Sequence, residues 1–452
     1  MNIADIERLI HEQRIEFVRF EQTDSHGISR SKTVPARHFR RFSEKGLNFL
    51  LGLLGFDVQA GLAPDTGYLE ELGFPDGRIF PDLRTFQIVP WAEDTARVIC
   101  EPYYLDGRPA MASPRLVVKL LLDELANLGY GLLSGFEYKF YLVDRQTGKP
   151  PFSGSQIFAT LRNTFDEDLV YDILRGMSAA GVDIITANAE QGPGQMEFNF
   201  APAMGVTAAD QAFTFKNGVK EIAAQHGYSA SFMTKPYAEQ SASGCHFHHS
   251  LVNLHTGENA FGNADEPSTL SDVARRFLGG QIVHAPAICA LAAPTVNCYK
   301  HYRIFSFSPT NATWGWENRT AGFRIKGLRG EGPHTESRLA GAAANPYLVM
   351  AATLAAGLDG LRNRIEPPAE ATGVAYVLNG VANLPTRLDD ALDALEADEP
   401  MKAALGHEFI KLFLAVKRHE LVKVRQHVQN YDTEDFNDHV TAWERDEYFE
   451  FL

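Results

Sequence analysis

A turn flanked by two carboxylates, NAEQGPGQME at residues 188–197, places the strictest demand on the fold of this chain. Glycine allows backbone angles that other residues avoid, and proline fixes its own φ, so the chain is expected to reverse direction here. Glu190 and Glu197 would then lie close together at the ends of two short strands. Buried carboxylates need a counter-charge, which a divalent metal ion supplies. Taken alone, the segment fits a surface hairpin with two solvated glutamates equally well.

The residues after the turn alternate between polar and apolar side chains. A period of two is typical of a strand with one face in the core. The polar face is expected to hold Gln195, Glu197 and Asn199. The core face is expected to hold Met196, Phe198 and Phe200.

Size and composition indicate a globular protein of more than one domain. The chain has 452 residues, of which 45% are hydrophobic and 22% are charged. Its net charge of −15 argues against general nucleic-acid binding, which favours a basic patch. We expect no membrane partner, because no apolar run approaches the length of a bilayer span and the first residues lack a signal-peptide core. Four cysteines without a CxxC pair indicate reduced thiols and a cytoplasmic location.

Local patterns divide the chain near residue 107. Residues 1–107 predict a small β-rich domain with one helix and a hairpin turning at Ser25-His26-Gly27. Ser113 and Pro114 then give the N-cap and first-turn signals of a helix. Farther on, antiparallel-type strands alternate with helices, and the last third is largely helical. These patterns predict an α+β fold with domains at residues 1–107 and 108–452.

Two more strand-like stretches have titratable side chains on one face. GCHFHHS places His246 and His248 on the same face, and neutral imidazole is a common metal ligand. FEYKF places Glu137 and Lys139 on the same face. Each pattern is weak by itself, because core or surface histidines and exposed ion pairs are common.

A fourth stretch is rich in guanidinium groups. It contains Arg319, Arg324, Glu336 and Arg338. Arginine binds phosphate and carboxylate oxygens through two nitrogens, although a solvated charged face has the same composition. Four such stretches in one chain favour a single composite pocket for a polyanion and metal ions over four coincidences.

Together these stretches resemble the glutamine synthetase family over nearly the whole chain. The family pattern is E-x-x-P-G-Q-x-E, K-P near G-x-H-x-H-x-S, N-x-Y-K, N-R-x-x-x-x-R, and E-x-R followed by A-N-P-Y-L. It is matched in order by Glu190/Glu197, Lys235-Pro236, His246/His248/Ser250, Asn297/Tyr299/Lys300, Arg319/Arg324, and Glu336/Arg338/Asn345-Pro346-Tyr347-Leu348.

The resemblance implies an architecture and a reaction. The fold would be an N-terminal β-grasp domain and a larger catalytic domain in which an antiparallel sheet forms a funnel with helices. Subunits would form a ring of six, or two stacked sixes, in which one N-terminal domain completes the neighbouring site. ATP would phosphorylate a carboxylate substrate, and an amine would displace the phosphate. Mg²⁺ or Mn²⁺ would neutralise the phosphate charge.

The resemblance also implies two sets of metal ligands. One set is Glu137, His246 and Glu336. The other uses Glu190 and Glu197 with a third acid two residues after Glu137, where this chain has Lys139. An ammonium group repels a cation, so either this second site has two ligands at best or Lys139 itself replaces part of the metal's charge.

Further residues are assigned to nucleotide and acid substrate by the same resemblance. The implied ATP-binding residues are Lys235, His248, Ser250, Arg319 and Arg324. Arg338 would hold the carboxylate of the acyl donor, and the implied catalytic residues are Asp57, Arg319 and Arg338.

The chain departs from the family pattern at the substrate end. The family's Asn-Gly, its glutamate-binding Arg, its ammonium-deprotonating Glu and its second Ser of F-D-G-S-S are all replaced. The corresponding residues are Ser241-Ala242, His301 (with Arg303 nearby but out of register), Phe307 and Ala60. Ammonium needs anionic and polar partners, so these changes favour an apolar or aromatic amine.

Three functions follow from these observations. The first is an ATP-dependent carboxylate–amine ligase that forms a γ-glutamyl amide or a related product from an amine larger than ammonia. The second is a non-catalytic ring, because stretches such as SPRLVVKLLLDEL resemble the branch of the family that includes the lens protein lengsin. The third is an ordinary glutamine synthetase.

Overall fold

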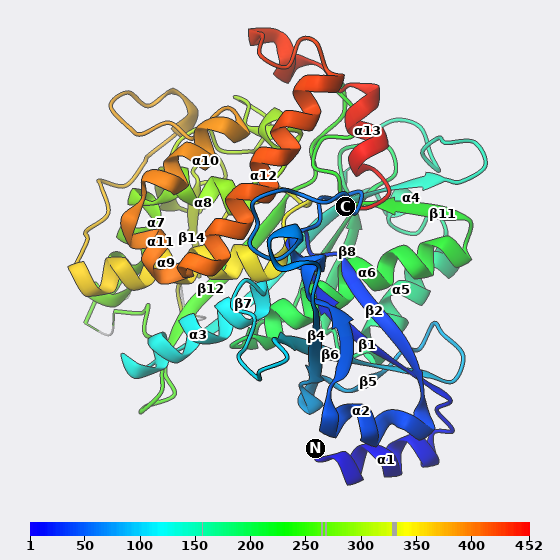
Figure 1. Ribbon diagram of the computed structural model, residues 1–452. Coiled ribbons are helices and arrows are strands. Elements are labelled where there is room, and N and C mark those ends of the chain that lie inside the picture. The colour runs from blue at the N-terminus through cyan, green and yellow to red at the C-terminus, as the bar shows by residue number, and fades with distance from the viewer. Residues whose placement is uncertain (156, 264, 267–268, 328–331) are drawn as a thin grey trace.

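The computed structural model describes residues 1–155, 157–263, 265–266, 269–327 and 332–452 (Figure 1). Two sheets with helices around them confirm the α+β class. No helix in the described residues combines the length and apolar character that a membrane span needs. A division into folding domains at residue 107 stays a prediction.

The N-terminal sheet has the strand order β2-β1-β6-β4-β3, with β5 beside β6. Strands β1 and β6 are parallel, and the other pairs are antiparallel. Helices α1 (Ile3–Glu12) and α2 (Phe39–Lys45) cover its outer end, seen in blue in Figure 1. The strands are β1 (Phe17–Thr23), β2 (Ser29–Pro35), β3 (Leu47–Leu50), β4 (Asp76–Pro81), β5 (Gln87–Ile88) and β6 (Thr95–Tyr103).

The larger sheet has the strand order β13-β14-β15-β12-β7-β9-β8, and β10 and β11 also pair with β7. It is antiparallel, as expected, except at its edge, where the short strands β13 and β14 run parallel. These strands are β7 (Tyr130–Asp144), β8 (Ile184–Ala189), β9 (Gln195–Phe200), β10 (Ala203–Met204), β11 (Tyr228–Ser231), β12 (Cys245–Asn253), β13 (Trp314–Trp316), β14 (Phe323–Lys326) and β15 (His334–Ser337).

The buried helix α9 consists of small and apolar residues and packs against α3, α6, α7, α8 and α11. Its glycines allow close contact with α7: a Cβ added at Gly360 would lie 2.1 Å from the carbonyl oxygen of Arg276. The helices are α1 (Ile3–Glu12), α2 (Phe39–Lys45), α3 (Pro114–Asn127), α4 (Thr160–Asn163), α5 (Glu167–Ala179), α6 (Thr207–Gln225), α7 (Asp272–Val283), α8 (Ala285–Ala292), α9 (Pro346–Asn363), α10 (Leu388–Ala397), α11 (Glu399–Leu405), α12 (His407–His427) and α13 (Ala442–Tyr448).

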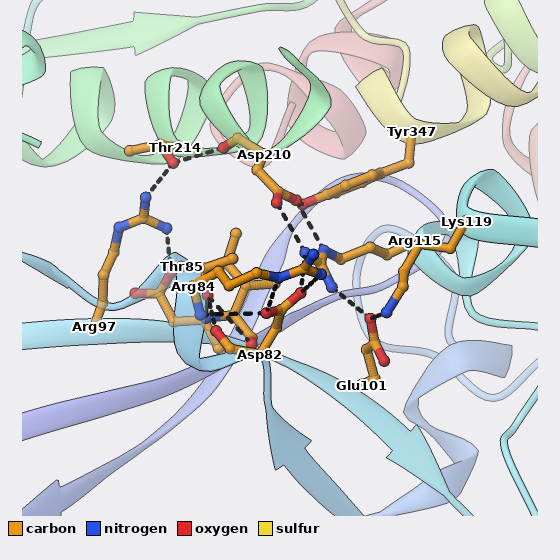
Figure 2. Close-up of polar contacts among 12 residues, drawn as sticks. Asp82, Arg84, Thr85, Arg97, Glu101, Arg115, Lys119, Asp210, Thr214 and Tyr347 are labelled. Carbon is orange, nitrogen blue, oxygen red and sulfur yellow. Dashed lines mark hydrogen bonds and ion pairs between the residues drawn. The ribbon is translucent and has the colours of Figure 1, made fainter. Parts of the chain in front are cut away.

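A buried ionic network around Arg115, at the start of α3, links the N-terminal sheet to the larger part of the chain (Figure 2). Its guanidinium lies 2.9 Å from both carboxylate oxygens of Asp210 on α6 and 3.0 Å from Asp82, which follows β4. It also contacts Glu101 on β6 at 2.5 Å. The hydroxyl of Tyr347 on α9 donates to Asp210 at 2.6 Å. One side chain therefore connects the N-terminal sheet to helices of the larger part of the chain.

Candidate active site

Strand register brings the predicted acidic and imidazole side chains onto one face of the larger sheet. On β7, Glu137 lies opposite His246 of β12, and Lys139 lies opposite Glu197 of β9. On β15, Glu336 lies between two cross-strand neighbours, His248 of β12 and Arg324 of β14. Residues far apart in sequence therefore become adjacent because the sheet places β7 and β12 at its centre.

The predicted turn at residues 190–194 forms as expected. Strands β8 and β9 are antiparallel, and Glu190 N–H donates to the carbonyl of Gln195 at 2.8 Å. Gly194 has φ +75°, and a Cβ there would lie 2.6 Å from the carbonyl oxygen of Leu142. Met196, Phe198 and Phe200 are buried, as predicted. The turn therefore brings Glu190 next to Glu197, and both side chains face a cavity.

Glu137, His246 and Glu336 form a group suited to one metal ion. Each offers a ligand atom, and these atoms all lie within 4.8 Å of one another. His246 Nδ1 is 2.6 Å from Glu137 Oε1 and 3.3 Å from Glu336 Oε1. Two carboxylates and an imidazole are a donor set that divalent cations accept. The residues present therefore fit a divalent ion, although their role as ligands stays a prediction.

Glu190 and Glu197 do not form a comparable group, because Lys139 lies between them. The Lys139 Nζ is 2.9 Å from Glu190 Oε1 and 3.4 Å from Glu137 Oε1, and it also contacts Glu197. Asn199 Nδ2 donates to the other oxygen of Glu197 at 3.1 Å. These residues bind an ammonium group in the structure, so they do not fit a second divalent ion.

The charges of this cluster shift its pKa values. Burial opposes ionisation of Glu137, but the charges of His246 and Lys139 outweigh it and hold the Glu137 pKa well below its usual value. Burial likewise opposes ionisation of Glu336, yet His246 and Arg338 lower its pKa to about 2. Burial raises the pKa of Glu197 to about 7, against the opposing charge of Lys139. Burial disfavours the charged form of Lys139, but its three carboxylate neighbours raise its pKa and keep it protonated.

A cavity of about 400 Å³ joins the acidic cluster to the predicted substrate residues. The predicted site residues that line it are Glu137, Glu190, Glu197, Ser241, Ala242, His246, His301, Phe307, Arg319, Arg324 and Arg338. The imidazole of His301 is buried, and its Nε2 has no hydrogen-bond partner among the described residues. Burial lowers the pKa of His301 to about 4, so this ring is neutral at pH 7.

The arginines hold the wall of this cavity together. Arg338 contacts Glu336 and donates to the backbone carbonyl of Phe307 at 2.7 Å. Arg324 donates to Glu336 Oε2 at 3.0 Å and also contacts Glu317. Glu336 is therefore held between two guanidiniums beside its imidazole neighbour. Arg319 is exposed at the cavity wall.

A second cavity of about 380 Å³ lies farther along the strand that carries His246. It is lined by the predicted residues His248 and Ser250, together with Asn259 and His334. Lys326 lines both cavities.

Besides the buried Glu336, three predicted site residues are not among those that line either cavity. The Lys235 ammonium contacts the carbonyl of Gln240, and Arg303 contacts the carbonyl of Asn437. Asp57 is buried, and its carboxylate is 2.7 Å from Lys423 Nζ on α12. None of these three is among the residues that line the cavities, and their roles stay predictions.

The sequence interpretation overlooked residues at the cavity mouth. Lys326 follows Arg324 by two positions on β14, so strand alternation could have placed it on the same face. Ile157 and Phe158 also line the cavity and are 45% and 61% exposed. They lie in a loop without periodicity, so no sequence pattern pointed to them. Phe307 is 59% exposed, so three large apolar side chains lie at the mouth.

Comparisons with known proteins agree with this geometry. Residues 111–436 match the family model described as glutamine synthetase, catalytic domain. Human lengsin is 36% identical over 443 aligned residues, covering 92% of this chain and 82% of lengsin. A glutamate–isopropylamine ligase from a Pseudomonas species is 32% identical, covering 95% of this chain and 96% of the ligase.

A solved structure described as a GmaS/ADP complex is 30% identical, with a TM-score of 0.85 over 98% of this chain and 99% of that one. Sequence and structural similarity thus both extend over nearly the whole length, and the strands that carry the acidic cluster fall within the family match. The chain belongs to the glutamine synthetase family.

Proposed function

We propose that this protein is an ATP-dependent carboxylate–amine ligase that forms a γ-glutamyl amide, or a closely related amide, from an amine larger than ammonia. The main observation in support is one cavity that combines the acidic and imidazole cluster, three arginines and large apolar side chains at its mouth. Similarity to a glutamate–isopropylamine ligase supports the reaction class. Similarity to a solved ADP complex supports the nucleotide.

The reaction would proceed through an acyl phosphate. A carboxylate oxygen of the acid attacks the γ-phosphorus of ATP and ADP leaves; the amine nitrogen then attacks the acyl carbon and inorganic phosphate leaves. Mg²⁺ or Mn²⁺ held by Glu137, His246 and Glu336 would neutralise phosphate charge. Arg319 lines the same cavity and is exposed, so its guanidinium can bind the transferred phosphoryl group. Arg338 fixes Glu336 and is the proposed contact for the acid.

The lining of the mouth supports an apolar amine. Phe307, Ile157, Phe158 and Ala242 all contribute apolar surface to the cavity. A primary amine with an alkyl or aryl group would bury that group against them, a gain in apolar contact that ammonium cannot make.

We also propose a closed ring of six subunits, or two stacked rings, in the cytoplasm. A head-to-tail interface between identical subunits produces a ring when its rotation closes. The four cysteines have free, buried thiols, which suits a reducing compartment. Light scattering of the purified protein tests the ring: a mass of six or twelve chains is expected, and a monomer contradicts it.

The test of the reaction is ATP-dependent phosphate release with glutamate, then other acids, against a panel of amines. We expect release with alkyl or aryl amines to exceed release with ammonia. Efficient turnover of ammonia would instead establish an ordinary glutamine synthetase.

A second candidate is a ring without turnover, because human lengsin is 36% identical to this chain. It predicts no phosphate release with any amine and no nucleotide binding by calorimetry.

A further inference from the structure

Lys139 occupies the centre of a group of three carboxylates that come from different parts of the sheet. Glu137 belongs to β7, Glu197 belongs to β9, and Glu190 begins the turn between β8 and β9. The ammonium is 2.9 Å from Glu190 and 3.4 Å from Glu137, and it contacts Glu197. A lysine ammonium has three N–H donors, so three carboxylate acceptors satisfy it completely.

The burial of this group makes an empty centre costly. The side chains of Glu190 and Glu197 are 10% and 11% exposed, and that of Lys139 is 16% exposed. Without a cation at their centre, three carboxylates would repel one another in a poorly solvated place. The chain therefore supplies internally the positive charge that carboxylate clusters otherwise take from a metal ion.

The space between Glu190 and Glu197 cannot hold a divalent ion together with the Lys139 ammonium. Mg²⁺ requires oxygen ligands at about 2.0–2.1 Å in near-octahedral geometry. Here the Glu190 oxygen is already engaged by Lys139 Nζ, and an ion between the two glutamates would lie against a positive charge.

We propose that the Lys139 ammonium stands in place of a second metal ion, so that this protein binds one divalent cation per chain outside any bound nucleotide. In the described part of the chain, the group that fits a metal is Glu137, His246 and Glu336. Glu137 joins the two positions, because its Oε1 faces both His246 Nδ1 at 2.6 Å and Lys139 Nζ at 3.4 Å.

The built-in ammonium acts as a positioning residue in the proposed ligase, and this role rests on the proposed function. Lys139 lines the cavity near Ser241 and Ala242, where it holds Glu190 and Glu197 in place. Its charge is covalently attached and cannot be removed by a chelator. Chelation therefore affects one cation position and leaves the other filled.

Metal stoichiometry tests the proposal directly. Full-length protein, free of nucleotide, is titrated with Mn²⁺, and bound ion is counted by electron paramagnetic resonance. We expect one Mn²⁺ per chain in the wild type and two in Lys139→Glu, with the added ion located between Glu190 and Glu197 by anomalous scattering. Lys139→Gln, which also frees the carboxylates, is a second route to two ions if Lys139→Glu does not fold.

Two controls separate charge from position. Lys139→Arg keeps a cation among the carboxylates, and Lys326→Gln removes a cavity lysine outside the cluster; both are expected to bind one Mn²⁺. Two Mn²⁺ on the wild type, or one on both Lys139→Glu and Lys139→Gln, would overturn the proposal. The ion count does not depend on turnover, so absent phosphate release would refute the ligase and leave this result standing.

Discussion

Arg338 donates a hydrogen bond of 2.7 Å to the backbone carbonyl of Phe307, while its other nitrogen contacts Glu336. A buried guanidinium thus connects the proposed metal position to the loop that carries the apolar wall of the cavity. Glu336 belongs to a strand, whereas Phe307 lies in a loop with φ +60°, a backbone region that non-glycine residues rarely adopt. Arg338 is therefore placed to fix this loop against the sheet.

We expect Arg338→Lys to weaken the use of the amine. One ammonium cannot reproduce two contacts from a planar fork, so one charge-assisted hydrogen bond of about 1.5–3 kcal/mol is lost. The kcat/KM for the amine should fall by about 10- to 100-fold in steady-state phosphate release. Arg362→Lys, at the exposed end of α9, is the matched control. Unchanged kinetics in Arg338→Lys would contradict this role.

We expect Phe307→Glu to shift the preference from apolar amines toward ammonia. A carboxylate at the mouth attracts ammonium and removes apolar surface, so kcat/KM for an alkyl amine should fall by about 10- to 100-fold. Competition between ammonia and the alkyl amine measures the shift. Phe305→Glu is the control, because Phe305 is exposed and its ring contacts Tyr376 rather than the cavity. Equal shifts in both variants would disprove the assignment.

We expect His246→Ala to weaken divalent metal binding by at least about 100-fold, because it removes one of three ligand atoms that lie within 4.8 Å of one another. Calorimetric titration with Mn²⁺ gives the affinity. His255→Ala changes an exposed histidine two residues past the end of β12 and should leave the affinity unchanged. If His246→Ala binds Mn²⁺ as tightly as the wild type, the ion does not bind at Glu137, His246 and Glu336.

We expect the Glu420 carboxylate to stabilise the fold above pH 4.5 and to lose this effect in acid. It is buried between Lys417 Nζ at 2.9 Å and His26 Nε2 at 2.6 Å. Burial opposes its ionisation, but the charges of Lys417 and His26 lower its pKa from 4.5 to about 2. A pKa lowered on folding gives stability that is complete above the unfolded value and disappears as pH falls through the folded one, here about 3 kcal/mol.

Thermal unfolding of the wild type and Glu420→Gln between pH 3 and 7 measures this effect. The stability difference between the two proteins should shrink as pH falls below 4.5, while the exposed control Glu16→Gln should follow the wild type throughout. A difference independent of pH would show that the effect is not one of charge.

The sequence predicted what depends on alternation along a single strand. Glu197 and Asn199 share a face because side chains in a strand alternate, and the structure shows them hydrogen-bonded at 3.1 Å. The close approach of Glu137, His246 and Glu336 needed the family resemblance as well, because these residues meet only through the order of three strands.

Contacts between distant segments could not be predicted from the sequence. The pairing of Asp57 with Lys423 joins the N-terminal part to α12, and no local pattern indicates it. For Lys139, the sequence showed only that its ammonium would repel a metal ion at this position, and it did not predict which carboxylates the ammonium contacts. The structure resolves this conflict, because β7 and β9 place the ammonium directly opposite Glu197.

The Arg115 network also limits how the chain can be shortened. A fragment beginning at residue 108 would retain Arg115 and Asp210 but lose Asp82 and Glu101, leaving the guanidinium with one of its three anionic partners. Removing one side of a buried ionic cluster costs about 3–5 kcal/mol, a large share of the stability of an ordinary domain. Truncation at this junction should therefore yield an insoluble C-terminal fragment, because the first hundred residues supply anionic groups that its fold requires.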